Sequence, residues 1–189
     1  MSAATQTSLL TLEQMLALPD NGTERELFRG ELYEKPVTRR NRRHSTVESL
    51  VVHFLTNWLF TQPEPRGDVV SGEAGFRLQR DPDTGVGIDV AYVSAEVAAR
   101  DPEAAYFEGA PVLAVEILSP SDTQEVIDEK VALYLKTGVA LVWVINPRFR
   151  TVIVHRPGAE PELFNASHEL TAEPHLPGFR VPVARLFPG

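Results

Sequence analysis

Two charged residues stand at positions whose neighbours predict burial. Glu116 interrupts the apolar segment 111–118, which is typical of a strand covered on both faces. Lys130 follows in a segment with helical periodicity, four residues after Val126 and four before Tyr134, so we expect it to face the sheet. Burying an unpaired charge is costly, and it usually requires a partner, a metal ion or protonation. Glu116 and Lys130 are therefore expected to lie together.

Asp89 is a third charged residue at a position whose neighbours predict burial. The segment 86–93 alternates in a way that predicts a strand with Asp89, Ala91 and Val93 on one face. Two carboxylates on neighbouring strands and a lysine from a covering helix suit a hard divalent cation, which prefers oxygen ligands. Such an ion activates water and neutralises charge on a phosphoryl oxygen, while an ammonium group stabilises that charge or orients the water. This chemistry is metal-assisted phosphodiester hydrolysis.

Each of these residues also has a simpler structural interpretation. Asp89 can be a solvated residue at the start of a strand after the turn at 81–85. Glu116 can lie at an exposed strand end, and Lys130 can extend its ammonium into water from the rim of the helix. All three would have to occur independently in elements that are expected to be neighbours. We therefore favour a functional cluster.

Length and composition indicate one domain, over residues 1–189, with 43% apolar residues to form its core. We expect no membrane span and no signal peptide, and hence a cytoplasmic protein without a membrane partner. The chain has no cysteine, so a bound metal would need oxygen or histidine ligands.

The net charge of −8, from 18 basic and 26 acidic residues, argues against indiscriminate binding of nucleic acid along the whole surface. One basic run stands out, and it consists of Arg39, Arg40, Arg42 and Arg43. It is the candidate contact with a phosphate backbone. The alternative is a solvated loop before a helix, which is a common meaning of a short charge run.

The order of expected elements defines a fold class. We expect a capped helix from 11, a hairpin of 26–28 and 31–33, a helix at 44–60, strands at 68–79, 86–93 and 111–118, a helix at 122–137, and strands at 140–145 and 151–156. The core therefore follows the order α-β-β-β-α-β. A hairpin combined with a strand-helix-strand crossover predicts an α/β protein with a mixed central sheet. The tail from Pro157 is expected to dock as an irregular arm with a short strand or turn.

This order, with Asp89 on the second core strand and Glu116 on the third, resembles the PD-(D/E)xK nuclease superfamily and its restriction-endonuclease-like fold. Within it, the chain is similar to the Uma-type restriction endonuclease family from about Leu12 to Phe187. The matching segments are 113–121, Glu129-Lys130, Tyr134, Gly138-Val139, 142–147 and 176–179.

The resemblance implies that Asp89 and Glu116 are ligands of Mg²⁺ or Mn²⁺. It implies that Lys130 is the motif lysine moved onto the helix, because the usual position, two after Glu116, holds Leu118.

Three further residues are accessory candidates. Glu31 and His44 match recurring positions of the family, with a hairpin salt bridge and helix capping as their structural alternatives. Glu73 is a possible additional acid near the metal.

Two functions follow from these residues. The first is a magnesium-dependent endodeoxyribonuclease, in which a homodimer cuts both strands of DNA. The alternative is a non-catalytic, dimeric binding or regulatory protein on a nuclease-like scaffold, in which the charged site is a structural network.

Overall fold

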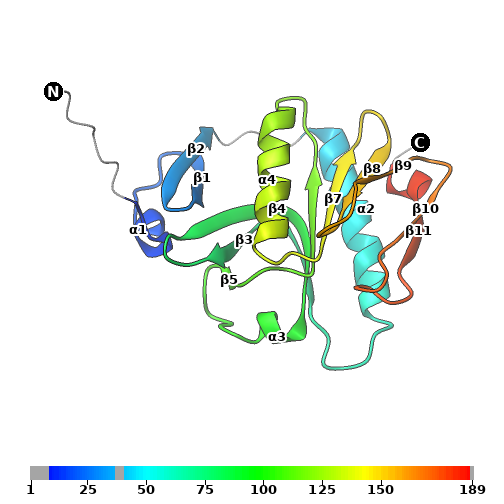
Figure 1. Cartoon of the computed structure of the whole chain (residues 1–189), viewed down its shortest axis with the longest axis horizontal. Coiled ribbons are helices and arrows are strands. Elements are labelled where there is room, and N and C mark those ends of the chain that lie inside the picture. The colour runs from blue at the N-terminus through cyan, green and yellow to red at the C-terminus, as the bar shows by residue number, and fades with distance from the viewer. Residues whose placement is uncertain (1–8, 37–40, 188–189) are drawn as a thin grey trace.

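The expected order of core elements is confirmed in the computed structural model, which describes residues 9–36 and 41–187 (Figure 1). Arg39 and Arg40 lie outside the described residues. The core consists of α2 (Arg42–Leu59), β3 (Asp68–Gln79), β4 (Thr84–Val93), β6 (Leu113–Ile117), α4 (Gln124–Lys136) and β7 (Leu141–Asn146).

The chain begins its described part with α1 (Leu12–Leu16) and the hairpin of β1 (Thr23–Phe28) and β2 (Glu31–Pro36). Thr11 and Gln14 form the expected capping box at the start of α1. Arg29 and Gly30 both have positive φ, 53° and 81°, which is the backbone of a tight two-residue hairpin turn. This turn positions β1 beside β4 in the main sheet.

The central sheet is mixed, as predicted. Its strand order is β2-β1-β4-β6-β7-β8-β9, where β8 is Thr151–His155 and β9 is Glu162–Phe164. β6 and β7 are parallel, and the neighbouring pairs β4–β6 and β7–β8 are antiparallel. β3 pairs with β4 and with the short β5 (Phe107–Glu108), which follows the one-turn helix α3 (Ala95–Ala98). Asp89 and Glu116 thus lie on adjacent strands.

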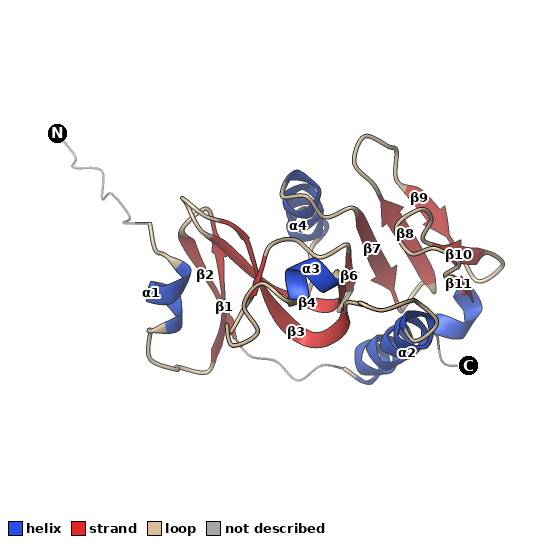
Figure 2. Cartoon of the chain, turned by 90° about the horizontal axis from the view of Figure 1, so that it is seen from below, coloured by secondary structure: helices blue, strands red, loops and turns tan. Residues whose placement is uncertain are grey.

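The two long helices cover opposite faces of this sheet (Figure 2). α4 packs Ile127, Val131 and Tyr134 against one face. α2 packs Val47, Val51 and Leu55 against the other.

The C-terminal segment contributes more to the core than an irregular arm would. It forms the two-stranded sheet of β10 (Glu169–Thr171) and β11 (Arg180–Pro182) and ends in the 3₁₀ helix η1 (Val183–Leu186). Its buried side chains pack with α2 and are Leu170, Ala172, Leu176, Phe179, Val181, Val183, Leu186 and Phe187. The sequence predicted only an irregular arm here, because apolar residues in such short strands give little indication of how deeply they are buried.

β4 departs from the alternation that the sequence predicts. Ile88 and Val90 are two residues apart, yet they pack into different core clusters, and Ile88 shares its cluster with Ala91. The partner strand β3 contains a register shift here, at Gly72 and Glu73, which have φ values of 81° and 61°. Such a bulge increases local strand twist, so strict alternation fails at Asp89.

Candidate active site

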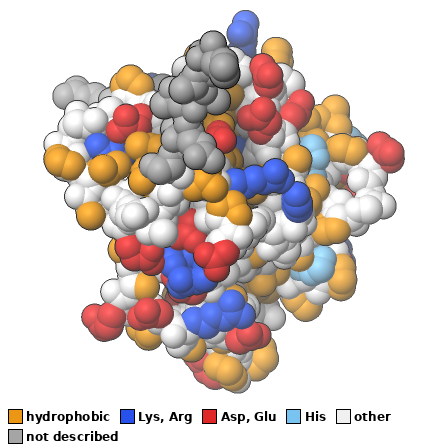
Figure 3. All heavy atoms as spheres, turned by 60° about the vertical axis from the view of Figure 1, so that its left-hand side comes forward, with side chains coloured by type: hydrophobic (Ala, Val, Ile, Leu, Met, Phe, Trp, Pro, Cys, Tyr) orange, Lys and Arg blue, Asp and Glu red, His pale blue; other side chains and the backbone are white. Residues whose placement is uncertain are grey.

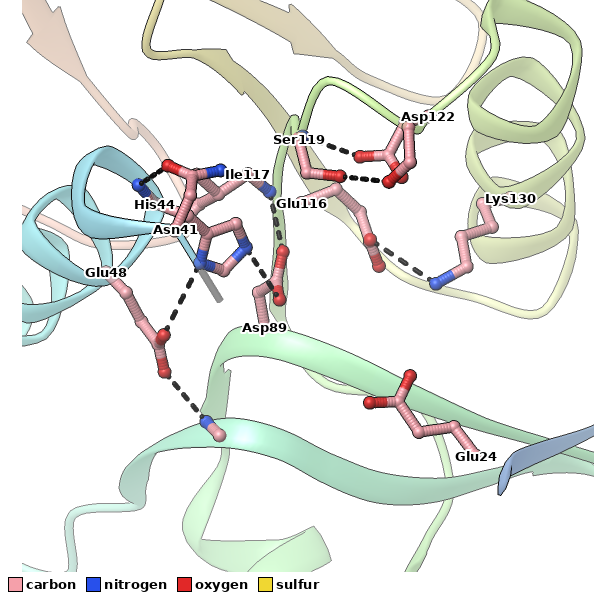
Figure 4. Close-up of polar contacts among 12 residues, drawn as sticks. Glu24, Asn41, His44, Glu48, Asp89, Glu116, Ile117, Ser119, Asp122 and Lys130 are labelled. Atoms are coloured by element: carbon pink, nitrogen blue, oxygen red, sulfur yellow. Dashed lines mark hydrogen bonds and ion pairs between the residues drawn. The ribbon is translucent and has the colours of Figure 1, made fainter. Parts of the chain in front are cut away.

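Glu116 is the fourth residue of β6, whose five residues are all buried. Its carboxylate meets two donors from α4. The Tyr134 hydroxyl donates to Oε1 at 2.6 Å. The Lys130 ammonium donates to Oε2 at 3.4 Å, as Figure 4 shows. The strand and its covering helix therefore meet through a charged contact beside the apolar cluster that α4 forms with the sheet.

Lys130 is only 6% exposed, and its ammonium lies 3.4 Å from Glu26 Oε1 as well as from Glu116. The buried residues of α4 are Ile127, Lys130, Val131 and Tyr134, which recur at the spacing of one helical face. The expectation that Val126 shares this face is wrong, since Val126 is 50% exposed. Ile127 takes its place, because the buried stripe lies one residue further along the helix.

The charges in this contact perturb one another. Burial raises the pKa of Glu116, and the negative charge of Asp89 raises it further, against the lowering effect of Lys130. Burial alone would lower the pKa of Lys130, but the neighbouring Glu116, Tyr134 and Glu26 raise it well above its ordinary value. Burial and Glu116 likewise raise the pKa of Tyr134. Lys130 is therefore a cation at neutral pH.

Asp89 connects this contact to the opposite helix. Its Oδ2 accepts a hydrogen bond from the backbone N–H of Ile117 at 2.8 Å, which ties β4 to the end of β6. Its Oδ1 lies 3.3 Å from Nε2 of His44, which comes from the first turn of α2. Asp89 is 5% exposed and lies between His44 and the pair of Glu116 and Lys130 (Figure 4).

His44 is buried between two acids rather than capping α2. The cap is Asn41, whose Oδ1 accepts the His44 backbone N–H at 3.0 Å. The other ring nitrogen of His44, Nδ1, lies 3.7 Å from Glu48, and Glu48 accepts the backbone N–H of Gly72 in the β3 bulge at 3.0 Å. The histidine thus links the bulge, α2 and Asp89.

Two further acids approach the cluster from β1 and β3. Glu26 accepts the backbone N–H of Gly87 at 3.2 Å, and the Glu73 carboxylate lies directly over Gly87, where an added Cβ would come within 2.5 Å of it. Glycine at this position leaves room for Glu73, two residues before Asp89. Glu31 lies elsewhere, at the exposed start of β2, on a groove of about 680 Å³ between the hairpin and α4 that Lys130 also lines.

The available side-chain donors suit Mg²⁺ or Mn²⁺ better than a metal ion whose ligands all come from the protein. Among residues 9–36 and 41–187 there is no group of three or more histidine or acidic side chains arranged to hold a metal ion. Mg²⁺ is commonly held by one or two carboxylates, with water and substrate phosphate completing its coordination. Asp89 and Glu116, on adjacent strands, are two such carboxylates.

Sequence reasoning identified Asp89, Glu116 and Lys130, which lie together, but it did not single out Glu26 or Glu48. Glu26 follows a period of two with Glu24 in a hairpin, which is also the pattern of a solvent-facing strand edge. Glu48 lies four residues after His44, a spacing that places both on one helical face and could have indicated their contact.

The fold and this cluster define a nuclease-like α/β protein. The model of the Uma2 family, described as "Putative restriction endonuclease", matches residues 12–184, and the chain belongs to this family. A crystal structure described as a "putative nuclease belonging to DUF820" from Anabaena variabilis ATCC 29413 is similar, with a TM-score of 0.78 and 24% identity. The match covers 94% of this chain and 97% of that one, and it shows a shared fold.

The comparison with curated proteins gives no match. Within the described part of the chain, no helix has the length and apolar character needed to cross a membrane.

Proposed function

We propose that this protein is a divalent-metal-dependent endonuclease that hydrolyses phosphodiester bonds of DNA. The observation that carries the proposal is the meeting of Asp89 and Glu116, from adjacent strands, with Lys130 from the covering helix. Membership of a family described as restriction endonucleases supports the reaction class. The cluster supplies two oxygen ligands and one fixed cation, which are the groups that this reaction requires.

Asp89 and Glu116 would hold Mg²⁺ or Mn²⁺, and the bound ion would lower the pKa of water and neutralise phosphate charge. Tyr134 fixes the orientation of Glu116 through its hydrogen bond, and the Ile117 N–H fixes that of Asp89. Lys130 acts as a cation and not as a base, because its raised pKa keeps it protonated. It would stabilise negative charge on the phosphoryl oxygens.

In the proposed reaction the water oxygen forms a bond to phosphorus, and the bond from phosphorus to the leaving ester oxygen breaks. The attacking water loses a proton, and the leaving oxygen takes one up from solvent. No oxidant or second substrate is needed. Lys130, Asp89 and Glu116 return to their starting states at the end of the cycle.

Cleavage of supercoiled plasmid DNA in Mg²⁺ or Mn²⁺ tests this proposal. We expect wild-type protein to nick the plasmid, and Asp89→Asn, Glu116→Gln and Lys130→Met to abolish nicking while circular dichroism remains unchanged. Glu169→Gln is the matched control, because it removes one exposed acid far along the chain in β10. Full activity in any of the three site variants would contradict the assignment.

The second candidate function is a binding or regulatory protein in which the cluster is a structural charge network. The specific observation that favours it is that both oxygens of Glu116 already accept hydrogen bonds, from Tyr134 and Lys130. Calorimetric titration with Mg²⁺ and Mn²⁺ separates the two functions. Binding that is lost in Glu116→Gln supports the nuclease, whereas no binding to wild type, with or without DNA, supports the structural network.

A homodimer is part of the nuclease proposal, because two copies related by a two-fold axis can place one site on each strand of a duplex. Sedimentation velocity of the protein with and without duplex DNA measures this. A protein that cuts both strands as a monomer would remove this part of the proposal.

A further inference from the structure

A second hollow, of about 490 Å³, lies on the other side of the first turn of α2 from Asp89. It is formed by that turn, by the turn between β7 and β8, and by the C-terminal end of the core. Its main lining residues are Arg42, Arg43, Thr46, Arg148, Arg150 and Phe187. We call it the arginine pocket. Arg148 and Arg150 are more than 100 positions from Arg42 in sequence, so the fold alone brings these cations together.

The lining of the arginine pocket has one sign of charge, although the chain carries a net charge of −8. Its four guanidinium groups form no ion pair with any described residue. Elsewhere, for example across the face shown in Figure 3, acidic and basic side chains are interspersed. Four arginines that gather without acids repel one another and concentrate positive potential, and an anion relieves that repulsion.

The β7–β8 turn holds the backbone of its arginines in a fixed conformation. Asn146 Oδ1 accepts the backbone N–H of Arg148 at 3.0 Å and that of Phe149 at 3.1 Å. Arg150 has a φ of 56°, which is unusual for a residue other than glycine. A turn that is restrained by its own side chain presents these guanidinium groups with less conformational entropy to lose on binding.

Aromatic rings accompany the cations. The Arg150 guanidinium lies 6.0 Å from the centre of the Phe187 ring, and the Arg148 guanidinium lies 5.6 Å from that of Phe149. Phe149 is 70% exposed. A guanidinium that lies over an aromatic ring is held there by cation–π attraction, so the two rings restrict how these arginines reach an anion. Four arginines spread over one hollow can contact more than one phosphate, as a nucleic-acid backbone requires and a single inorganic anion does not.

The pocket and the acidic cluster share the first turn of α2. His44 points from it toward Asp89, while the preceding residue, Arg43, lines the pocket. A DNA backbone that runs across this turn would therefore contact the pocket on one side of α2 while it reaches toward Asp89 on the other.

We propose that Arg148 and Arg150, with Arg42 and Arg43, form a clamp for the DNA backbone beside the bond that is cut. The location of the cut rests on the proposed nuclease function, whereas binding of DNA by the clamp does not. The clamp holds the strand in register with the acidic cluster, which by itself repels phosphate. It would also explain how an acidic protein can hold a polyanion.

Fluorescence anisotropy with a labelled 20-base-pair DNA duplex in EDTA tests the clamp without any cleavage. We expect Arg148→Gln/Arg150→Gln to weaken binding about tenfold or more. We also expect the slope of log K against log salt to fall by about 1.8, because each lost phosphate contact contributes about 0.9. The double variant Arg148→Lys/Arg150→Lys should keep the slope, because it keeps both charges.

The matched control is Arg80→Gln/Arg180→Gln, which removes two exposed arginines that pair with Glu108 and Glu169. Equal binding by the pocket variant and this control would overturn the clamp, as would absence of DNA binding by wild type. Tighter binding of an RNA duplex through the same arginines would overturn the assignment to DNA. Plasmid cleavage run in parallel keeps the two proposals distinct. Binding through the clamp without cleavage contradicts only hydrolysis, and cleavage that is insensitive to the pocket variant contradicts only the clamp.

Discussion

Two cations are buried in this protein to almost the same extent, Lys130 at 6% exposure and Arg77 at 5%. Each lies among carboxylates. Lys130 contacts Glu116 from β6, and Arg77, on β3, donates a hydrogen bond to Glu13 from α1. By burial and by partner type the two regions look alike.

The pKa values of the carboxylates in the two regions shift in opposite directions. Burial raises the pKa of Glu116, even with Lys130 beside it. The hydrogen bond from Arg77 lowers the pKa of Glu13 to about 2, since Glu13 remains 65% exposed and loses little solvation. A buried cation is therefore not a functional signal by itself. The signal is a carboxylate whose charged form burial disfavours, so that its pKa rises, as is common at functional sites.

The largest effect should come from removing the charge of Glu116. We expect Glu116→Gln to lower the DNA cleavage rate at least about 10³-fold, as the proposed metal ligand is lost. In chelator its free energy of unfolding should stay close to that of wild type, because burial penalises the charge that is removed and Glu26 remains beside Lys130 as its partner. Plasmid nicking and urea denaturation measure the two quantities. A strongly destabilised variant would mean that Glu116 is a structural anchor.

Removing the charge of the other buried cation, Arg77, should have the opposite effects: stability should fall and the cleavage rate should not. We expect Arg77→Met to lower the free energy of unfolding by about 3 kcal/mol, because the charges of Glu108 and Asp83 lose a partner in a mostly buried setting. The cleavage rate of the folded variant at low temperature should match wild type. Urea denaturation and nicking at 15 °C check this pair of outcomes. A selective loss of activity would place Arg77 in the functional region.

A smaller effect is expected from Tyr134→Phe, which deletes the hydroxyl that donates to Glu116 and leaves the ring. A hydrogen bond to a charged group contributes about 1.5–3 kcal/mol. Its loss should raise the pKa of Glu116 further and lower the cleavage rate at neutral pH about tenfold. If the rate is unchanged, the hydroxyl does not position Glu116 for catalysis.

The smallest effect is expected for the contribution of Glu13 to stability as the pH falls. Its folded pKa of about 2 lies below its ordinary value of 4.5, so its contribution to stability is present above pH 4.5 and is lost as pH falls toward 2. We expect wild type to be more stable than Glu13→Gln at pH 6, and the difference to shrink between pH 5 and pH 2. Thermal unfolding across this range measures it. A difference that is constant with pH would show that the contact with Arg77 does not depend on charge.

Local patterns predicted the elements well because each pattern depends only on neighbours in sequence. The apolar run around Glu116 predicted a buried strand, and the helical spacing around Lys130 predicted its inward orientation. The side of the sheet that Asp89 reaches could not be predicted, because it depends on a bulge in β3, whose residues Gly72 and Glu73 carry no alternation of their own.

Long-range neighbours were the other limit. Glu26 reaches Lys130 only because the hairpin places β1 beside β4. Arg148 and Arg150 join Arg42 only after the sheet has formed. Helical and strand periods contain no information about such encounters. Glu26, Arg148 and Arg150 therefore looked like ordinary surface charges in the sequence.

The last described residues have a consequence for how the protein is made. α2 packs early residues such as Val51 and Leu55 against Phe179 and Leu186, so the core on that side is complete only when these late residues are present. During synthesis the first long helix can pack on the sheet, but it lacks these C-terminal contacts until nearly all of the described chain has left the ribosome. Under the proposed function, an unfinished chain would therefore hold α2, and with it His44, less firmly against Asp89 and would cleave DNA less well.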